Sequence, residues 1–278
     1  MMNRRTFLRG VSAAVAISAA GKIATAVTPR HFSRKTVFRF AVGSDLHYGE
    51  PKTQYDQFFQ DLQSAFHQFE RQHPCEFFVF NGDIFHNDPA LLPTAAAKLK
   101  TLHPKLLVTH GNHDMVNAAT WEQAWGMPLN HDVVIGDHVI LLGNTADDKG
   151  KYICPDVEWF AAKLEQYRNA KNIFIFLHIT PVKWTDNGLD CASFQELIRK
   201  YPNIRAVFNG HDHDQDGVKM MENSKIPFLF DGHAGGSWGV GYHGFRVVEL
   251  KDDGSLLSYI MNPLSKQDER TFERITNS

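Results

Sequence analysis

Residues 106–114 read LLVTHGNHD, a short apolar run followed at once by side chains that can bind metal. The run Leu106–Thr109 has the length and composition of a buried strand. The segment His110–Asp114 then places an amide, a carboxylate and two imidazoles within five residues. A single such residue after a strand is usually a turn former or a helix cap. The combination Gly-Asn-His-Asp is more distinctive, and it predicts a functional loop at the end of a strand.

Four other apolar runs end in the same way. The run 37–42 leads into Asp45-Leu46-His47, 77–80 into Asn81-Gly82-Asp83, 173–177 into His178, and 204–208 into Asn209-Gly210-His211-Asp212-His213. Open α/β sheets place their ligand crevice at the carboxyl ends of the strands. Five strands that all end in such side chains therefore predict one shared site rather than five unrelated turns.

Longer segments of helix-like composition alternate with these strands, at 54–71, 89–102, 155–170 and 190–201. Such alternation predicts βαβ units and a partly parallel sheet with helices on its outer faces. The last third carries strand-like runs joined by turns, at 218–221, 226–230, 245–250 and 256–261. We expect these runs to form an antiparallel set that completes the same core, because no Pro/Ser-rich linker precedes them.

Composition excludes several classes of protein. With 29 Lys plus Arg against 31 Asp plus Glu, the net charge of −2 provides no field that would gather nucleic acid or an anionic membrane. The three cysteines, Cys75, Cys154 and Cys191, show no Cys-x-x-Cys spacing. They predict neither a disulfide framework nor a thiolate zinc site. The 15 histidines are unusual, and they matter if several converge on one place.

The first 26 residues have the pattern of a bacterial export signal. Arg4-Arg5 precede the apolar stretch 11–20, which is shorter than the roughly 20 residues that span a bilayer. The stretch is followed by the small-residue sequence Ala24-Thr25-Ala26. The pair of arginines resembles the twin-arginine type of signal. We therefore expect a periplasmic or extracellular protein whose single domain spans 27–278. The alternative is an N-terminal amphipathic or buried helix.

Five sequence blocks follow these strands in order: Asp45-x-His47, Gly82-Asp83, Gly111-Asn112-His113-Asp114, His178 and Gly210-His211-x-His213. Together they resemble the blocks of the calcineurin-like metallophosphoesterase superfamily. The resemblance extends from residue 37 to roughly residue 260. It implies a mixed α/β (α+β) fold, a four-layer αββα sandwich of two mixed β-sheets flanked by helices. It also implies two divalent metal ions (Mn, Fe or Zn). The implied ligands are Asp45, His47 and His213 on the first ion, Asn112, His178 and His211 on the second, and Asp83 bridging both.

The types of ligand agree with such a centre. Carboxylate and amide oxygens together with imidazoles, without thiolate, suit catalytic divalent ions rather than a structural zinc. The resemblance implies that a hydroxide bridging the two ions attacks phosphorus. It also places His113 beside the leaving group as the general acid, with Asp114 as the partner that holds its ring.

Four residues are candidate substrate contacts. His86 follows Gly82-Asp83 at a place where several branches of the superfamily have Asp or Tyr. The segment 232–244 reads GHAGGSWGVGYHG and contains six glycines together with His233, Trp238 and His243. It predicts a mobile loop that offers stacking and hydrogen bonds to a substrate. The alternatives are a surface turn for His86 and a flexible hairpin crossing for the glycine-rich segment.

The function predicted from these observations is that of an exported, binuclear metal-dependent phosphoesterase. Its expected substrate is a small soluble phosphate ester, with a phosphodiester favoured over a monoester. The alternatives are a phosphomonoesterase of the same superfamily, a nuclease, and a non-catalytic metal-binding module. Export and the acidic charge that remains without residues 1–26, 25 basic against 31 acidic residues, argue against a nucleic-acid substrate. No stable membrane span is expected.

Overall fold

The computed structural model describes residues 14–17, 23–26, 34–262 and 265–273. Residues Met1–Lys35 and Thr36–Ser278 form two separate units. In the first, β1 (Ala14–Ile17) pairs antiparallel with β2 (Ile23–Ala26). Most of the predicted export signal lies outside the described residues, so export stays a prediction.

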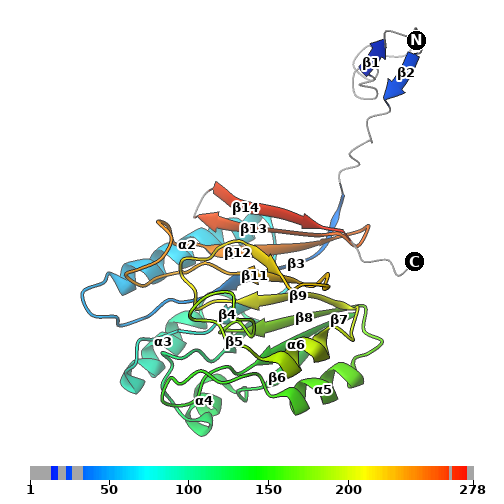
Figure 1. Ribbon diagram of the computed structural model, residues 1–278. Helices are drawn as coiled ribbons and strands as arrows, with labels where there is room; N and C mark the ends of the chain where they lie inside the picture. The colour runs from blue at the N-terminus through cyan, green and yellow to red at the C-terminus, as the bar shows by residue number, and fades with distance from the viewer. Residues whose placement is uncertain (1–13, 18–22, 27–33, 263–264, 274–278) are drawn as a thin grey trace. The chain divides into compact units, whose positions relative to one another are not determined.

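Two six-stranded sheets form the second unit (Figure 1). The first contains, in spatial order, β14 (Ser265–Phe272), β13 (Leu256–Asn262), β12 (Phe245–Lys251), β3 (Thr36–Gly43), β4 (Phe78–Asn81) and β5 (Leu106–Thr109). The second contains β10 (Val218–Met220), β11 (Pro227–Phe230), β9 (Ile204–Asn209), β8 (Asn172–Leu177), β7 (His138–Gly143) and β6 (His131–Ile135).

Both sheets are mixed. In the first, β3, β4 and β5 are parallel, while β12, β13 and β14 continue the sheet in antiparallel order. In the second, β7, β8, β9 and β11 are parallel, and β6 and β10 are antiparallel edge strands. The last third of the chain is therefore not one antiparallel set, because β11 inserts parallel to β9.

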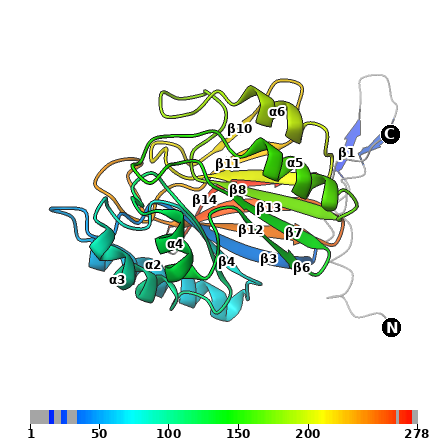
Figure 2. The same cartoon turned by 90° about the horizontal axis from the view of Figure 1, so that it is seen from below.

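Helices cover the outer face of each sheet (Figure 2). Their bounds are α2 (Tyr55–Gln72), η1 (Pro89–Leu91), α3 (Leu92–Leu99), α4 (Ala118–Trp125), α5 (Val157–Gln166) and α6 (Ala192–Ile198). Apolar side chains of α2, α3 and α4 pack on the first sheet, and those of α5 and α6 pack on the second. Among the described residues, none of these helices has both the length and the apolar character needed to cross a membrane.

Phenylalanine side chains fill the space between the two sheets. Alternate residues of β3 point there, because successive side chains of a strand face opposite sides. The ring of Phe40 lies 5.1 Å from that of Phe174 and 5.7 Å from that of Phe208. On the other face of the first sheet, Phe66 of α2 meets Phe78 of β4 at 4.7 Å. The predicted four-layer αββα sandwich is thereby confirmed.

Candidate metal centre

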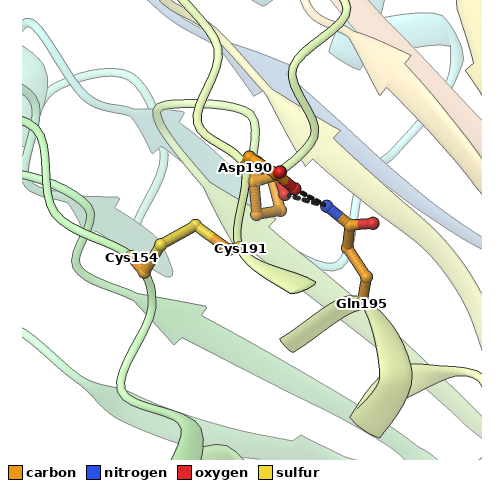
Figure 3. The surroundings of a disulfide bond; sticks show 5 residues. Cys154, Asp190, Cys191 and Gln195 are labelled. Atoms are coloured by element: carbon orange, nitrogen blue, oxygen red, sulfur yellow. Dashed lines mark hydrogen bonds between the residues drawn. A yellow bond between two sulfur atoms is a disulfide. The ribbon is translucent and has the colours of Figure 1, made fainter. Parts of the chain in front are cut away.

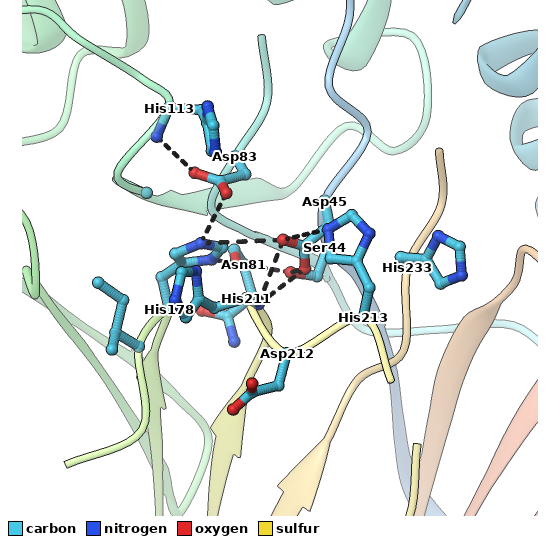
Figure 4. Close-up of polar contacts among 12 residues, drawn as sticks. Ser44, Asp45, Asn81, Asp83, His113, His178, His211, Asp212, His213 and His233 are labelled. Atoms are coloured by element: carbon cyan, nitrogen blue, oxygen red, sulfur yellow. Dashed lines mark hydrogen bonds and ion pairs between the residues drawn. The ribbon is translucent and has the colours of Figure 1, made fainter. Parts of the chain in front are cut away.

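Five of the predicted ligands lie together where loops from both sheets meet (Figure 4): Asp45, Asp83, His178, His211 and His213. They follow the carboxyl ends of β3, β4, β8 and β9. The backbone N–H of His211, after β9, lies 3.2 and 3.0 Å from the two carboxylate oxygens of Asp45, after β3. Because β3 and β9 belong to different sheets, this contact joins the two halves of the sandwich at the site.

Several of these residues turn the backbone sharply. Asp45, His47, Asp83 and His211 have φ values of 56°, 47°, 49° and 67°, in the left-handed region that non-glycine residues seldom adopt. The loops after β3 and β4 brace one another, since the N–H of Asp45 donates to Gly82 O at 3.0 Å and that of His47 to Asp83 O at 3.1 Å. Backbone strain held by the surrounding structure is typical of functional sites.

The first group of candidate ligands consists of Asp45, His47 and His213, all buried. The Nε2 atoms of His47 and His213 lie 3.1 Å apart, and Nε2 of His213 lies 3.2 Å from Oδ1 of Asp45. Three ligand atoms therefore converge on one point. Among the described residues, no lysine or arginine forms an ion pair with Asp45.

The second group contains Asp83, His178 and His211. Nε2 of His178 lies 3.1 Å from Oδ2 of Asp83. Its other nitrogen, Nδ1, donates to the backbone carbonyl of Asn81 at 2.7 Å, which orients Nε2 toward the carboxylate. Asp83 also lies 3.7 Å from Nε2 of His47, so its carboxylate stands between the two groups.

Unsatisfied polar atoms indicate that this second group fits a metal ion. Nε2 of His211 and Oδ1 of Asn112 are buried and have no hydrogen-bond partner among the described residues, whereas Nε2 of His178 has only its ion-pair contact with Asp83. A buried polar atom without a partner is costly. An imidazole nitrogen or an amide oxygen left free in this way can act as a ligand, and the donor set suits a divalent ion.

The charged groups of the centre shift one another's proton affinities. Burial lowers the pKa of His47 to about 3. Burial also acts to lower the pKa of His178, but Asp83 and Asp45 outweigh it and raise that pKa to about 10. The pKa values of Asp45 and Asp83 fall, because neighbouring histidines outweigh the opposing effect of burial. Without metal, a proton on His178 balances part of the negative charge, and ion binding would release that proton.

A set of residues behind the ligands was not predicted. Ser44 Oγ contacts Asp45 Oδ2 and lies 2.8 Å from the carbonyl of Asn81. The side-chain amide of Asn81 donates to the buried carboxylate of Asp231 at 2.8 Å. Asn81 thereby links Asp231 to His178. The Asn81-Gly82 pair directly before Asp83 was the only local sign of this arrangement in the sequence.

Two glycines of the predicted blocks are required by close packing. A Cβ atom on Gly111 would lie closer than 3.0 Å to the backbone nitrogen and the carboxylate of Asp83. One on Gly210 would lie closer than 3.0 Å to Ser44 Oγ and Asp45 Oδ2. No real Cβ atom packs so closely, so only glycine lets the loops approach one another at the site.

Asp114 does not hold the ring of His113, which corrects the expectation drawn from the resemblance. Its Oδ1 accepts hydrogen bonds from the backbone N–H of Ile84 at 2.8 Å and of Phe85 at 3.1 Å. Its Oδ2 accepts from the N–H of Gly111 at 2.9 Å. Asp114 is fully buried and ties together the loops that follow β4 and β5.

His113 is instead positioned by Asn87. Nδ1 of His113 lies 2.8 Å from Oδ1 of Asn87. The backbone N–H of His113 donates to Oδ1 of Asp83 at 2.8 Å, which places the imidazole beside the second group of ligands (Figure 4). The ring centroids of His113 and His47 lie 4.8 Å apart. The side chain therefore borders both groups.

Two of the candidate substrate residues lie at the rim of the centre. Nδ1 of His86 lies 3.1 Å from Nδ1 of His47, and its ring is stacked on that of His113 at 4.8 Å. Trp238 is 42% exposed and lies parallel to the ring of His213, at 4.3 Å and 5°. Both side chains therefore have one face toward the candidate ligands and a part that solvent reaches.

The other two candidates lie behind the ligands. His233 is buried, and its two ring nitrogens lie 2.6 and 3.0 Å from carbonyl oxygens of its own loop. It has no ring nitrogen left for a substrate, which corrects that expectation, and it supports the ring of His213 by stacking at 4.7 Å. His243 packs on Phe58 of α2 and lines a separate cavity of about 200 Å³.

Cys154 and Cys191 form a disulfide, which the cysteine spacing did not predict (Figure 3). Their Cα atoms are 5.7 Å apart and 37 positions separate them in sequence. Cys154 is exposed shortly before α5, whereas Cys191 is buried directly before α6. Cys75 is the free cysteine.

The two loops joined by the disulfide both touch the segment that carries His211. The ring of Tyr152, two residues before Cys154, lies edge-on to that of His211 at 4.8 Å. On the other loop, the side chains of Thr185 and Asn187 donate to the carboxylate of Asp212 at 2.8 and 2.9 Å. The disulfide therefore connects two supports of the second group of ligands.

Comparisons with known proteins agree with this geometry. A family profile described as Calcineurin-like phosphoesterase matches residues 38–215. No curated protein matches the chain. A dimetal phosphatase from Danio rerio has a TM-score of 0.67 and 14% identity, covering 87% of this chain and 100% of that one.

Two further solved structures share the fold. A purple acid phosphatase from yellow lupin (Lupinus luteus) has a TM-score of 0.63 and 12% identity, covering 93% of this chain and 58% of that one. GAP50, the anchor in the inner membrane complex of Plasmodium, has a TM-score of 0.59 and 14% identity, covering 88% and 90%. At these identities the likeness shows the fold alone.

Proposed function

Because the chain belongs to the calcineurin-like phosphoesterase family, we propose that it is a binuclear metal-dependent phosphoesterase that prefers small phosphodiesters. The observation that carries this proposal is the convergence of two ligand groups on the Asp83 carboxylate. The first group is Asp45, His47 and His213, and the second includes His178 and His211. The buried ligand atoms without hydrogen-bond partners support the presence of ions in the functional protein.

Two divalent ions held there would supply an activated water and would neutralise charge on the phosphoryl oxygens. The residues of the chain supply the rest of the proposed chemistry. His113 borders both ligand groups, and its Nδ1 is occupied by Asn87. Its Nε2 is therefore the atom that donates a proton to the departing alkoxide, a contribution of about 10²–10⁴-fold.

The charge of the site favours a monoanionic diester over a dianionic monoester. Among the described residues, no lysine or arginine forms an ion pair with Asp45 or Asp83, and the charged partners of both carboxylates are histidines. A dianion would need more positive charge than two ions retain after binding two carboxylates and hydroxide. The positive charge left over suits one negative charge on the substrate.

We also propose that the protein is exported. The twin-arginine-like start of the sequence motivates this proposal, and the disulfide between Cys154 and Cys191 supports it, because disulfides persist mainly in oxidising compartments. Fusing residues 1–30 to a reporter and replacing Arg4 and Arg5 with lysine tests it. Loss of periplasmic reporter in the double variant is expected, and unchanged export would contradict a twin-arginine route.

The test of the enzymatic proposal is hydrolysis of paired chromogenic esters, bis(p-nitrophenyl) phosphate and p-nitrophenyl phosphate. Chelator should abolish turnover, and added Mn²⁺ should restore it. A higher kcat/KM for the diester is expected. A preference for the monoester would identify a phosphomonoesterase instead, as the two phosphatases of the same fold would suggest. Absence of turnover on both esters, in protein that binds two ions, would favour a non-catalytic metal-binding module.

A further inference from the structure

The two ring nitrogens of His47 face different partners. Nε2 lies 3.1 Å from Nε2 of His213, 3.7 Å from the carboxylate of Asp83 and 3.9 Å from that of Asp45. Nδ1 lies 3.1 Å from Nδ1 of His86. An ion in the first group would therefore be bound through Nε2, and His86 contacts the nitrogen on the opposite side of the ring.

This geometry sets the position of one hydrogen on each ring. A nitrogen that binds a metal ion carries no proton, so a neutral, metal-bound His47 carries its proton on Nδ1. That N–H donates to Nδ1 of His86, which must then be an acceptor. Neutral His86 consequently holds its own proton on Nε2. Ion binding by His47 thus selects one tautomer of His86.

His86 lies where such a donor is useful. It is half-buried, directly after the segment that carries Asp83. Its ring is parallel to that of His113, 4.8 Å away at 17°. If His113 is to reach the leaving oxygen, the phosphoryl group must lie beside His113, and therefore beside His86.

We propose that His47 positions His86 as a neutral Nε2–H donor that binds an anionic phosphoryl oxygen of the substrate. The inference rests on the proposed metal-dependent phosphoester chemistry and adds a specificity-determining residue to it. A neutral donor stabilises a phosphoryl oxygen without adding charge, which agrees with the preference for a monoanionic diester.

The first test needs no turnover. Zn²⁺ is diamagnetic, so the ¹⁵N shifts of the His86 ring can be measured by NMR in the metal-free and the Zn²⁺-loaded protein. We expect the Nε2–H tautomer in the loaded protein. A Nδ1–H tautomer or an imidazolium there would overturn the proposal, even if the protein hydrolyses phosphodiesters. Conversely, absence of hydrolysis would leave this measurement interpretable.

Two substitutions test the two ring nitrogens of His86 independently. The amide of Asn in His86→Asn lies near the position of Nδ1, and that of Gln in His86→Gln lies near Nε2. His86→Asn should keep the affinity for the first ion and weaken the binding of inorganic phosphate to the loaded protein about tenfold. His86→Gln should largely keep phosphate binding and weaken the first ion about tenfold. His73→Asn, an exposed histidine away from the centre, is the control. The proposal would be overturned if His86→Asn and His86→Gln weakened the ion and the phosphate equally, or if neither variant changed either affinity.

Discussion

Nδ1 of His113 lies 2.8 Å from the side-chain oxygen of Asn87, a residue of the loop after β4. An amide oxygen only accepts hydrogen bonds, so the contact requires a proton on Nδ1. The other ring nitrogen, Nε2, is then the atom available to a substrate. Asn87 has a φ of 62°, a conformation that asparagine tolerates better than most residues. The loop therefore turns at the point where it must orient His113.

Asn87→Ala should lower kcat for phosphate esters with poor leaving groups about tenfold, because His113 loses the partner that orients its ring. Asn87→Asp keeps an acceptor oxygen and should restore kcat to within a few-fold of the wild type. Metal content by elemental analysis should be unchanged in both. If alanine and aspartate were equally harmful, the side-chain oxygen would not be the feature that matters.

Replacing His113 itself should have a larger effect of the same kind. His113→Ala is expected to retain both ions, because each of the two groups that contain a carboxylate, Asp45/His47/His213 and Asp83/His178/His211, stays complete without it. His113 belongs only to a third possible group, formed by histidines alone with His47 and His86. Turnover of alkyl esters should fall by about 10²–10⁴-fold, whereas p-nitrophenyl esters, whose leaving group needs little protonation, should lose much less. The measurement is kcat on a series of esters of graded leaving-group pKa. A loss that does not depend on the leaving group would exclude His113 as the general acid.

The convergence of the candidate ligands could be predicted because their signal is local. Each follows an apolar run directly, and the structure ends a strand at or close to each of these places, as at Thr109 before His110 and at Leu177 before His178. The helices at 54–71 and 155–170 were predicted in the right places for the same reason, with ends that differ by a few residues from α2 and α5.

Features that depend on distant parts of the chain could not be predicted. Asn87 contacts a residue 26 positions away, and Asn81 contacts Asp231 across 150 positions. No local pattern contains such pairs. The strand β14 was missed because its sequence, SKQDERTF, is too polar to give a strand signal. Among the described strands its one partner is β13, at the edge of the sheet.

The disulfide should stabilise both the fold and the second group of ligands. Replacing Cys154 and Cys191 with serine is expected to lower the free energy of unfolding by about 2–4 kcal/mol, since the crosslink no longer restricts the unfolded chain. The loops it joins support His211 and Asp212, so the affinity for the second ion should fall more than that for the first. Calorimetric unfolding and a metal titration measure the two effects, with Cys75→Ser as control. Equal weakening of both ions would argue against a local role.

Gly210→Ala should disrupt the contact between the two sheets at the site. Its Cβ would overlap Ser44 and Asp45 and push the loop after β9 away from that after β3. We expect a loss of about 1–3 kcal/mol in stability and a marked loss of the first ion. Gly217→Ala is a matched control, because a Cβ there meets no atom within 4 Å. Normal metal binding by Gly210→Ala would mean that the loops relax without moving the ligands.

A carboxylate far from the metal centre should make stability depend on pH. Burial raises the pKa of Glu249, but hydrogen bonds from Lys251, Thr36 and Tyr259 outweigh it and, with Arg39, lower the pKa from 4.5 to about 2. A carboxyl whose pKa is lower in the folded than in the unfolded state stabilises the fold fully when the pH is above its pKa in the unfolded state. That contribution disappears as the pH falls through its pKa in the folded state. The stabilisation should thus be complete above pH 4.5 and lost on approach to pH 2.

Glu249→Gln should therefore destabilise the protein by about 2 kcal/mol at pH 7, because charged hydrogen bonds become neutral ones. The difference from the wild type should shrink between pH 4.5 and pH 2, where the wild-type carboxyl itself becomes neutral. Urea unfolding of wild type and variant at several pH values measures this. Glu158→Gln, on the exposed face of α5, controls for the general effect of removing one charge. A difference that stayed constant down to pH 2 would show that the side chain contributes through packing and not through its charge.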